Sequence, residues 1–135
     1  SFLHFGVIVA IVGFLLASLA SVVALAAEPA LVSISQEALL ERQQKDDETT
    51  YVLDVRSPEE YASGHVPGAV NIPYDQIASR IAEVPKDKDV VLYCKSGRRA
   101  GIAADVLAAN GYTRLSHLEG DMPAWVAKGR AVEKP

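Results

Sequence analysis

The charged residues of this chain are confined to one part of it, and this division limits what can fold. Ser1–Ala27 contains no Asp, Glu, Lys or Arg, so all 13 basic and 17 acidic residues lie in Glu28–Pro135. A segment as long as Glu28–Pro135 can bury one hydrophobic core without disulfides or metals. We therefore predict two regions: residues 1–27 are a signal peptide or an N-terminal membrane anchor, and residues 28–135 are one folded domain.

The uncharged segment has features of both an export signal and a membrane span. The bulky apolar run Val7–Leu16 precedes an Ala/Ser-rich stretch, and Ala24–Ala26 matches the A-x-A pattern of a cleavage site. Phe5–Ala27 is also long enough to cross a bilayer, which needs about 20 apolar residues. Glu28–Glu48 is acid-rich, whereas a segment that stays on the cytoplasmic side of a membrane span is typically rich in Lys and Arg. We favour an exported, periplasmic domain, with membrane anchoring through residues 1–27 as the alternative.

Composition excludes several classes of function. A net charge of −4 and a pI near 5.3 argue against a nucleic-acid-binding protein. Cys94 is the single cysteine, which rules out an intramolecular disulfide, a redox pair of cysteines and a cysteine zinc cluster. The three histidines, His4, His65 and His117, lack the spacing of a metal motif. We expect no metal and no other cofactor.

The folded region alternates apolar strand-like runs with helix-like segments. The predicted strands are Tyr51–Val55, Asp89–Tyr93 and Arg114–Leu118, with a short apolar run at Ala69–Ile72. The predicted helices are Gln36–Gln44 capped by Ser35, a first turn at Pro58, Tyr74–Val84, Ala100–Asn110 with Ile102, Val106 and Leu107 on one face, and Pro123–Lys128. This alternation indicates parallel β-α-β units. We predict an α/β fold with a central parallel sheet flanked by helices, preceded by an N-terminal hydrophobic helix.

The chemistry concentrates between a predicted strand and a predicted helix. Cys94 follows the strand, and ligands bind at the carboxyl ends of strands in such sheets. Lys95, Arg98 and Arg99 place three bases in six positions with no acid among them, and Gly97 permits a tight turn. Cations and a helix N-terminus favour the nucleophilic thiolate. The alternative is an inert core cysteine, but a core does not tolerate such cations, so we predict a reactive Cys94.

Four motifs resemble, in order, the signatures of the single-domain rhodaneses, a family of sulfurtransferases. They are Leu53–Arg56 with Glu59–Tyr61, Gly64–Pro73, the C-x-x-G-x-R loop at Cys94–Arg99, and Gly120–Gly129 with Ala124 and Trp125. The resemblance covers roughly Val32–Lys134 and implies a rhodanese-like three-layer domain. One departure is Asp121, where a second glycine is common. We expect it to lie away from the Cys94 loop and to alter only its own turn.

The resemblance implies that Cys94 takes a sulfur from a donor such as thiosulfate and becomes a persulfide. Cyanide or a thiol would then remove that sulfur, in covalent catalysis with ping-pong kinetics. The implied substrate-binding residues are Lys95, Ser96, Gly97, Arg98 and Arg99, because their backbone N–H groups would stabilise the anions. Lys95 and Arg98 would hold an oxyanion donor. Arg99 would either join them or turn inward to an acid of the Glu59–Tyr61 motif, Glu59 or Glu60. We expect a monomer whose partners are small molecules.

Other residues of the motifs have structural interpretations. We expect His65 to make a hydrogen bond within its loop rather than to act as a catalytic base. Asp54 and Arg56 are expected to tie the end of a strand to neighbouring loops, and Trp125 to pack the last helix on the sheet. His117 is interpreted as a structural or surface residue.

Two rival functions remain. Related cysteine phosphatases and arsenate reductases use a Cys-x5-Arg loop, but here Arg99 comes one position too early and Ala100 stands where the arginine is needed. The other rival is a sulfur carrier or binding module that does not turn over. Production of thiocyanate from thiosulfate and cyanide would separate an enzyme from a carrier.

Overall fold

Five short strands form one sheet in this computed structural model, which describes residues 31–135. The strands are β1 (Val32–Ile34), β2 (Thr50–Asp54), β3 (Val70–Asn71), β4 (Asp89–Tyr93) and β5 (Leu115–Leu118). Their order is β1-β5-β4-β2-β3, and every pairing is parallel. The predicted α/β fold with a central parallel sheet is therefore confirmed. The prediction of a signal peptide, anchor or hydrophobic helix in residues 1–27 lies outside the described residues and stays a prediction.

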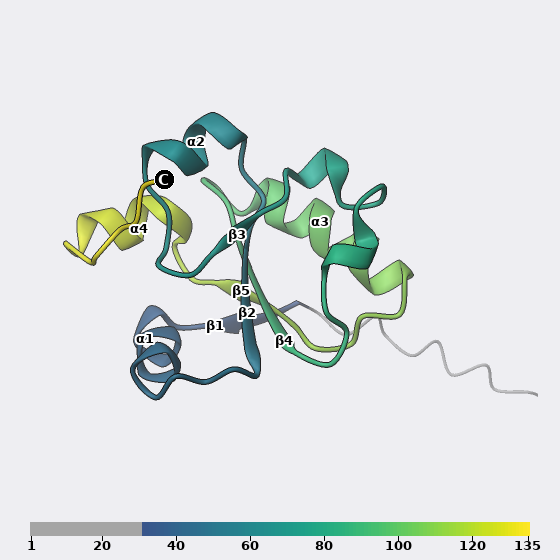
Figure 1. Ribbon diagram of the computed structural model, residues 1–135, viewed down its shortest axis with the longest axis horizontal. Helices are drawn as coiled ribbons and strands as arrows, with labels where there is room; N and C mark the ends of the chain where they lie inside the picture. The colour runs from purple at the N-terminus through teal and green to yellow at the C-terminus, as the bar shows by residue number, and fades with distance from the viewer. Residues whose placement is uncertain (1–30) are drawn as a thin grey trace, which may run out of the picture.

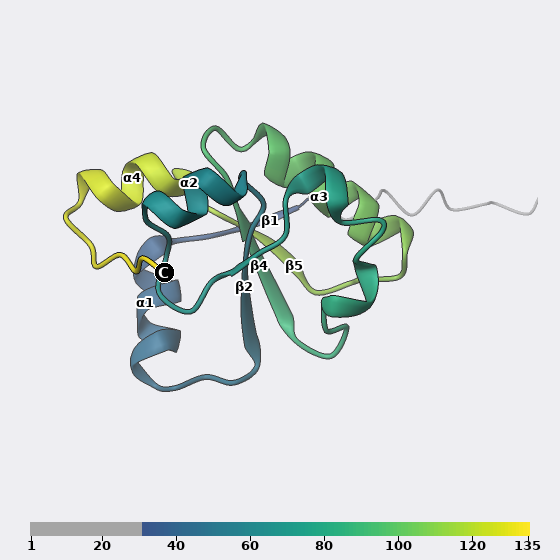
Figure 2. The same ribbon diagram turned by 45° about the horizontal axis from the view of Figure 1, so that its top comes forward.

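Helices cover both faces of the sheet. They are α1 (Gln36–Gln44), α2 (Pro58–Ser63), α3 (Arg98–Ala109) and α4 (Asp121–Ala127), with two 3₁₀ turns, η1 (Tyr74–Gln76) and η2 (Ile81–Glu83). Figures 1 and 2 show α1, α2 and α4 on one side of the sheet and α3 on the other. Within residues 31–135, no helix combines the length and apolar character of a membrane span.

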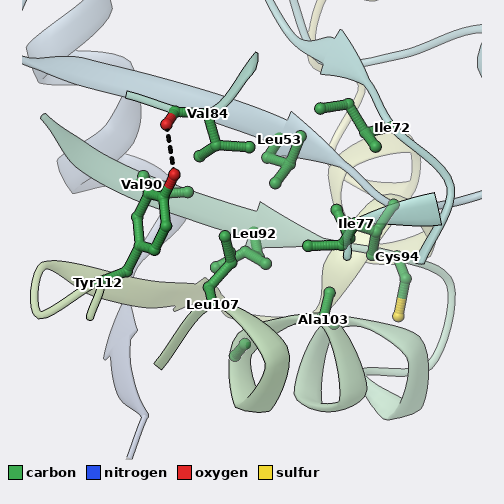
Figure 3. Close-up of a cluster of buried hydrophobic side chains, with 13 residues drawn as sticks. Leu53, Ile72, Ile77, Val84, Val90, Leu92, Cys94, Ala103, Leu107 and Tyr112 are labelled. Carbon is green, nitrogen blue, oxygen red and sulfur yellow. Dashed lines mark hydrogen bonds between the residues drawn. The ribbon is translucent and has the colours of Figure 1, made fainter. Parts of the chain in front are cut away.

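The alternation of side chains along β4 divides the core in two. Val90 and Leu92 point to the face covered by α3, and Cys94 continues their alternation just beyond the strand. Val91 and Tyr93 point to the face covered by α1 and α4. Because both faces of the sheet are covered, the strand is an almost uninterrupted apolar run. Figure 3 shows Cys94 at the end of the α3-side cluster, with its sulfur directed toward α3.

Local sequence signals fix several elements at the predicted positions. α1 and β4 have the predicted bounds, and the Ser35 side chain caps α1 by accepting a hydrogen bond from the Ala38 N–H at 3.1 Å. α2 begins with a capping box in which the side chains and backbones of Ser57 and Glu60 bond reciprocally. β2 and β5 lie within one residue of their predicted bounds.

The helix predicted over Tyr74–Val84 is wrong, because the structure has two separate 3₁₀ turns there. The apolar spacing is helical, but the carbonyls at its end have other partners. The Tyr112 hydroxyl donates to the carbonyl oxygens of Ile81 and Val84, at 2.9 and 2.6 Å, and Figure 3 shows its bond to Val84. Pro85 has no N–H with which to continue a helical ladder.

Two helices begin earlier than predicted, and the residues of one predicted helix face differ in burial. α3 begins at Arg98 instead of Ala100, and α4 at Asp121 instead of Pro123. In both cases a glycine in the left-handed region precedes the helix, with φ of 91° at Gly97 and 74° at Gly120. The buried face of α3 consists mainly of alanines, so Ile102, predicted to share a face with Leu107, is exposed while Leu107 is buried. β1, a short edge strand paired with β5, was not predicted.

Candidate active site

Cys94 lies at the carboxyl end of β4, where its backbone is held on both sides. Its N–H donates to Asp121 Oδ1 at 2.9 Å, and its carbonyl accepts from the Met122 N–H at 3.0 Å. Both partners belong to the first turn of α4, so this helix fixes the position of Cys94. The residue is fully buried. Its thiol is therefore out of direct contact with solvent.

The loop that follows Cys94 turns a backbone donor toward the sulfur. The Gly97 N–H donates to Cys94 Sγ at 3.0 Å, and Gly97 has the left-handed φ of 91° that favours glycine. α3 starts at the next residue, so the positive end of its dipole faces the same region. A bonded N–H and a helix N-terminus both stabilise negative charge on sulfur. The predicted loop at Cys94 thus has the geometry of an anion-stabilising turn.

The cations of the loop divide into two groups. Lys95 and Arg98 are exposed, as is Ser96. Arg99 is directed away from solvent and forms a two-pronged ion pair with Glu60 of α2, at 2.6 and 3.1 Å. Of the two orientations left open by the sequence, the structure has the inward one, and the partner is Glu60. The hydrogen bonds from Arg99 lower the pKa of Glu60 to about 2. The predicted substrate-binding residues Lys95, Ser96, Gly97, Arg98 and Arg99 therefore share one loop. Within residues 31–135, Arg99 pairs with an acid, whereas Lys95 and Arg98 do not.

Asp121 corrects the sequence interpretation. It was expected to lie away from the Cys94 loop, but its carboxylate accepts the Cys94 N–H and is buried. Asp121 has φ of 54°, in the left-handed region. That backbone conformation explains why glycine suits this position. The aspartate adds to it a carboxylate at the site.

His117 lies beside the Cys94 loop, a position that the sequence interpretation did not identify. Its Nε2 lies 2.9 Å from Asp121 Oδ1, and its ring is half-buried. The hydrogen bond to Asp121 raises the pKa of His117 despite the opposing effect of burial. Two signals pointed here: His117 is the penultimate residue of β5, next to the site, and Asp121 departs from the glycine pattern four residues later. Neither signal identifies the contact without the turn between β5 and α4.

The end of β2 next to the site is a closed polar network. Arg56 donates to both oxygens of Asp54 at 2.7–3.1 Å and to the Gly64 carbonyl at 2.8 Å. The Tyr93 hydroxyl donates to Asp54 Oδ2 at 2.6 Å, and Asp54 and Arg56 are buried. The prediction that Asp54 and Arg56 tie the strand end to its loops is confirmed.

His65 and Trp125 both make structural hydrogen bonds. His65 is buried, and its Nδ1 lies 2.9 Å from the carbonyl oxygen of Tyr61, so its partner belongs to α2 and not to its own loop as predicted. Trp125 is fully buried against the sheet, and its indole N–H donates to the Ala131 carbonyl. Within residues 31–135, no group of three or more His, Cys, Asp or Glu side chains is arranged to hold a metal.

Comparisons with known proteins agree with this geometry. The family model described as "Rhodanese-like domain" matches residues 35–128. The chain is 39% identical over 102 residues to a sulfurtransferase of Allochromatium vinosum, covering 76% of this chain and 94% of that protein. It is 43% identical over 70 residues to the thiosulfate sulfurtransferase PspE of Escherichia coli, covering 50% of this chain and 67% of PspE. A rhodanese-related protein of Thermoplasma volcanium superposes with a TM-score of 0.68 at 27% identity, covering 77% and 99% of the two chains.

Proposed function

The chain belongs to the rhodanese-like domain family, and we propose that it is a sulfurtransferase that carries sulfane sulfur as a persulfide on Cys94. The observation that carries this proposal is the hydrogen bond from the Gly97 N–H to Cys94 Sγ at 3.0 Å. A thiol needs no such donor, whereas a thiolate and a persulfide anion are both stabilised by it. Residues 1–135 contain one cysteine, so the sulfur has one site of attachment among them.

The first half-reaction proposed is attack on a donor such as thiosulfate. The Cys94 thiolate forms a bond to the outer sulfur of thiosulfate, and the sulfur–sulfur bond of the donor breaks. Sulfite leaves with that electron pair, and Cys94 becomes a persulfide anion. The exposed Lys95 and Arg98 supply positive charge for the donor's oxyanion end.

The second half-reaction removes the sulfur. Cyanide or a thiolate acceptor forms a bond to the outer sulfur, the bond from that sulfur to Cys94 breaks, and the Cys94 thiolate is regenerated. The products are thiocyanate or a persulfide of the acceptor. Since the donor product leaves before the acceptor reacts, the kinetics are ping-pong.

The position of Arg99 disfavours phosphatase or arsenate reductase activity. An oxyanion centred on phosphorus or arsenic needs an arginine that reaches over the thiolate loop. The N–H groups on both terminal nitrogens of Arg99 instead donate to the carboxylate of Glu60. The proposed attack on sulfur uses the exposed Lys95 and Arg98 for the donor's oxyanion end instead.

The experiment that tests the proposal is an intact mass measurement with thiosulfate. We expect a gain of one sulfur atom on Cys94 and its removal by cyanide with production of thiocyanate. A gain of one sulfur without repeated turnover would identify a sulfur carrier, and no gain with thiosulfate would overturn the thiosulfate assignment.

Cys94→Ser is the matched variant for the mass measurement. We expect it to fold with unchanged stability, to gain no sulfur and to produce no thiocyanate. Sulfur transfer at the full rate by Cys94→Ser would refute the persulfide mechanism.

A further inference from the structure

Asp121 keeps an unfavourable backbone conformation at the site. Its φ of 54° follows the left-handed φ of 74° at Gly120, and residues other than glycine are uncommon in the left-handed region. A glycine would avoid this cost but would have no carboxylate. The carboxylate accepts the Cys94 N–H at 2.9 Å. Strain kept beside a reactive residue indicates that the strained side chain contributes to the site.

His117 extends this contact to the other residue that holds the sulfur. A methyl carbon added at Gly97 would lie 3.3 Å from His117 Cε1 and 3.5 Å from Asp121 Oδ2. The His117–Asp121 pair therefore packs directly against Gly97, whose N–H donates to Cys94 Sγ. Through Asp121 the pair also holds the Cys94 N–H. The pair thus contacts both ends of the turn that surrounds the sulfur.

The charge of this pair depends on the protonation of His117. Burial opposes ionisation of Asp121, but the hydrogen bonds from His117 and from the Cys94 N–H outweigh it and lower the Asp121 pKa. The acids that face His117 are Asp121 from α4 and Glu119 from the preceding turn, and both raise its pKa. The pair is neutral when His117 is protonated. It carries one negative charge when His117 is neutral.

We propose that His117 and Asp121 are positioning residues for Cys94, and that protonated His117 offsets the Asp121 charge next to the sulfur. Asp121 fixes the Cys94 backbone, while His117 holds Asp121 and packs against Gly97. The thiolate then forms beside a neutral pair rather than beside an uncompensated carboxylate, which would oppose it. The consequence for the persulfide rests on the proposed sulfur transfer.

Titration of the thiolate tests the proposal without any sulfur donor. Cys94 is the single cysteine, so the thiolate absorbance in the ultraviolet, with Cys94→Ser as the blank, reports this residue alone. His117→Gln keeps an amide donor for Asp121 and removes the titratable charge. We expect thiolate formation to move to higher pH by about one unit, the lower range of the effect of a nearby like charge.

A second change separates charge from packing. In the double variant His117→Gln, Asp121→Asn the pair is neutral at every pH, and asparagine keeps an oxygen for the Cys94 N–H. We expect the double variant to return to the wild-type profile. A purely structural role would instead make the double variant the more damaged of the two. An unmoved profile in His117→Gln, or no recovery in the double variant, would overturn the proposal.

Two controls complete the experiment. Glu119→Gln removes an exposed acid close to the pair and should shift the profile much less than His117→Gln. If His117→Gln does not fold, Asp121→Asn alone decides the question: thiolate formation above the wild-type pH would contradict the proposal.

The titration and the persulfide measurement test separate claims. A shifted titration with no persulfide formation would contradict the proposed function only. Persulfide formation with an unmoved titration would contradict the role of the His117–Asp121 pair only.

Discussion

Two neighbouring strands, β2 and β4, end at the same edge of the sheet, with Asp54 opposite Tyr93 in the parallel register. At the end of β2, Asp54 and Arg56 are buried and neutralise each other, and Tyr93 completes the network. At the end of β4, Cys94 is buried but the cations beyond it, Lys95 and Arg98, face solvent. The end of β2, here called the closed end, has the charges of Asp54 and Arg56 paired. The end of β4, the open end, has positive charge available to an incoming anion.

The difference shows that the closed end supports the fold, whereas the open end offers its charges to a ligand. A paired charge in the interior contributes a fixed geometry, and losing one partner leaves the other unpaired at high cost. An exposed cation contributes little to stability and can be changed without unfolding the chain. Arg99 lies between the two cases, because it starts in the Cys94–Arg99 loop and pairs with Glu60 of α2. The pair ties the open end to α2, the helix that follows the closed end in the chain.

The most severe test removes the cation of the closed end. Arg56→Ala leaves the Asp54 carboxylate buried without its ion pair, and we expect a loss of about 3–5 kcal/mol in the free energy of unfolding. Urea denaturation measures it. Arg98→Ala at the open end is the matched control and should change stability by about 0.5 kcal/mol or less. Equal effects of the two substitutions would remove the distinction between the ends.

A milder change to the closed end deletes one hydroxyl. In Tyr93→Phe, Asp54 loses a donor at 2.6 Å and the Val66 N–H loses an acceptor at 3.0 Å. We expect a loss of about 1–3 kcal/mol in thermal or urea unfolding, because buried groups are left unsatisfied. Tyr74→Phe serves as the control, since the Tyr74 hydroxyl makes no hydrogen bond to protein groups within residues 31–135. Unchanged stability in Tyr93→Phe would show that the network tolerates a gap.

At the open end, Lys95→Ala should affect substrate and not folding. We expect KM for thiosulfate to rise up to about fivefold with little change in kcat, because an exposed ion pair contributes up to about 1 kcal/mol. The effect should diminish with added salt. Lys88→Ala removes a lysine from the opposite end of β4 and should leave KM unchanged. The same KM in wild type and Lys95→Ala would remove Lys95 from donor binding.

The smallest effect concerns the ion pair between Arg99 of the open end and Glu60 of α2. Because the pKa of Glu60 is lowered to about 2, its contribution to stability is complete above its ordinary pKa and is lost as pH falls toward about 2. The side chain is partly exposed, so solvent screening limits the contribution to about 0.5 kcal/mol. Urea unfolding of wild type and Glu60→Gln should differ at neutral pH and converge in acid. A difference that persists in acid would contradict this origin.

Much of the fold follows from signals that are local in the sequence. The Ser35 cap and the apolar run of β4 each depend on adjacent residues, and both elements have their predicted bounds. The 3₁₀ turns over Tyr74–Val84 could not be predicted in this way, because the competing partner is Tyr112. β1 was missed since a three-residue strand has no periodicity of its own and depends on pairing with β5.

In the candidate site, too, the residues close together in sequence were predicted and the long-range contacts were not. The cysteine, the glycine turn and the cations are adjacent in sequence, so Cys94–Arg99 was identified directly. The start of α3 at Arg98 was missed, because a left-handed Gly97 ends the loop sooner than the residue pattern suggests. His117 and Asp121 come 23 and 27 residues after Cys94 in the chain. Only the return of the chain through β5 into α4 brings them against the loop.

The burial of Cys94 also limits which large molecules can react with its sulfur. A disulfide requires two sulfurs about 2 Å apart, and two copies of the folded chain cannot bring their buried sulfurs that close. The single cysteine is thereby protected from cross-linking between copies. In the proposed cycle, the sulfur to be transferred lies one bond beyond Cys94 Sγ. The same burial that shields the unloaded cysteine from bulky thiols therefore leaves the outer sulfur as the atom of the persulfide that an acceptor meets first.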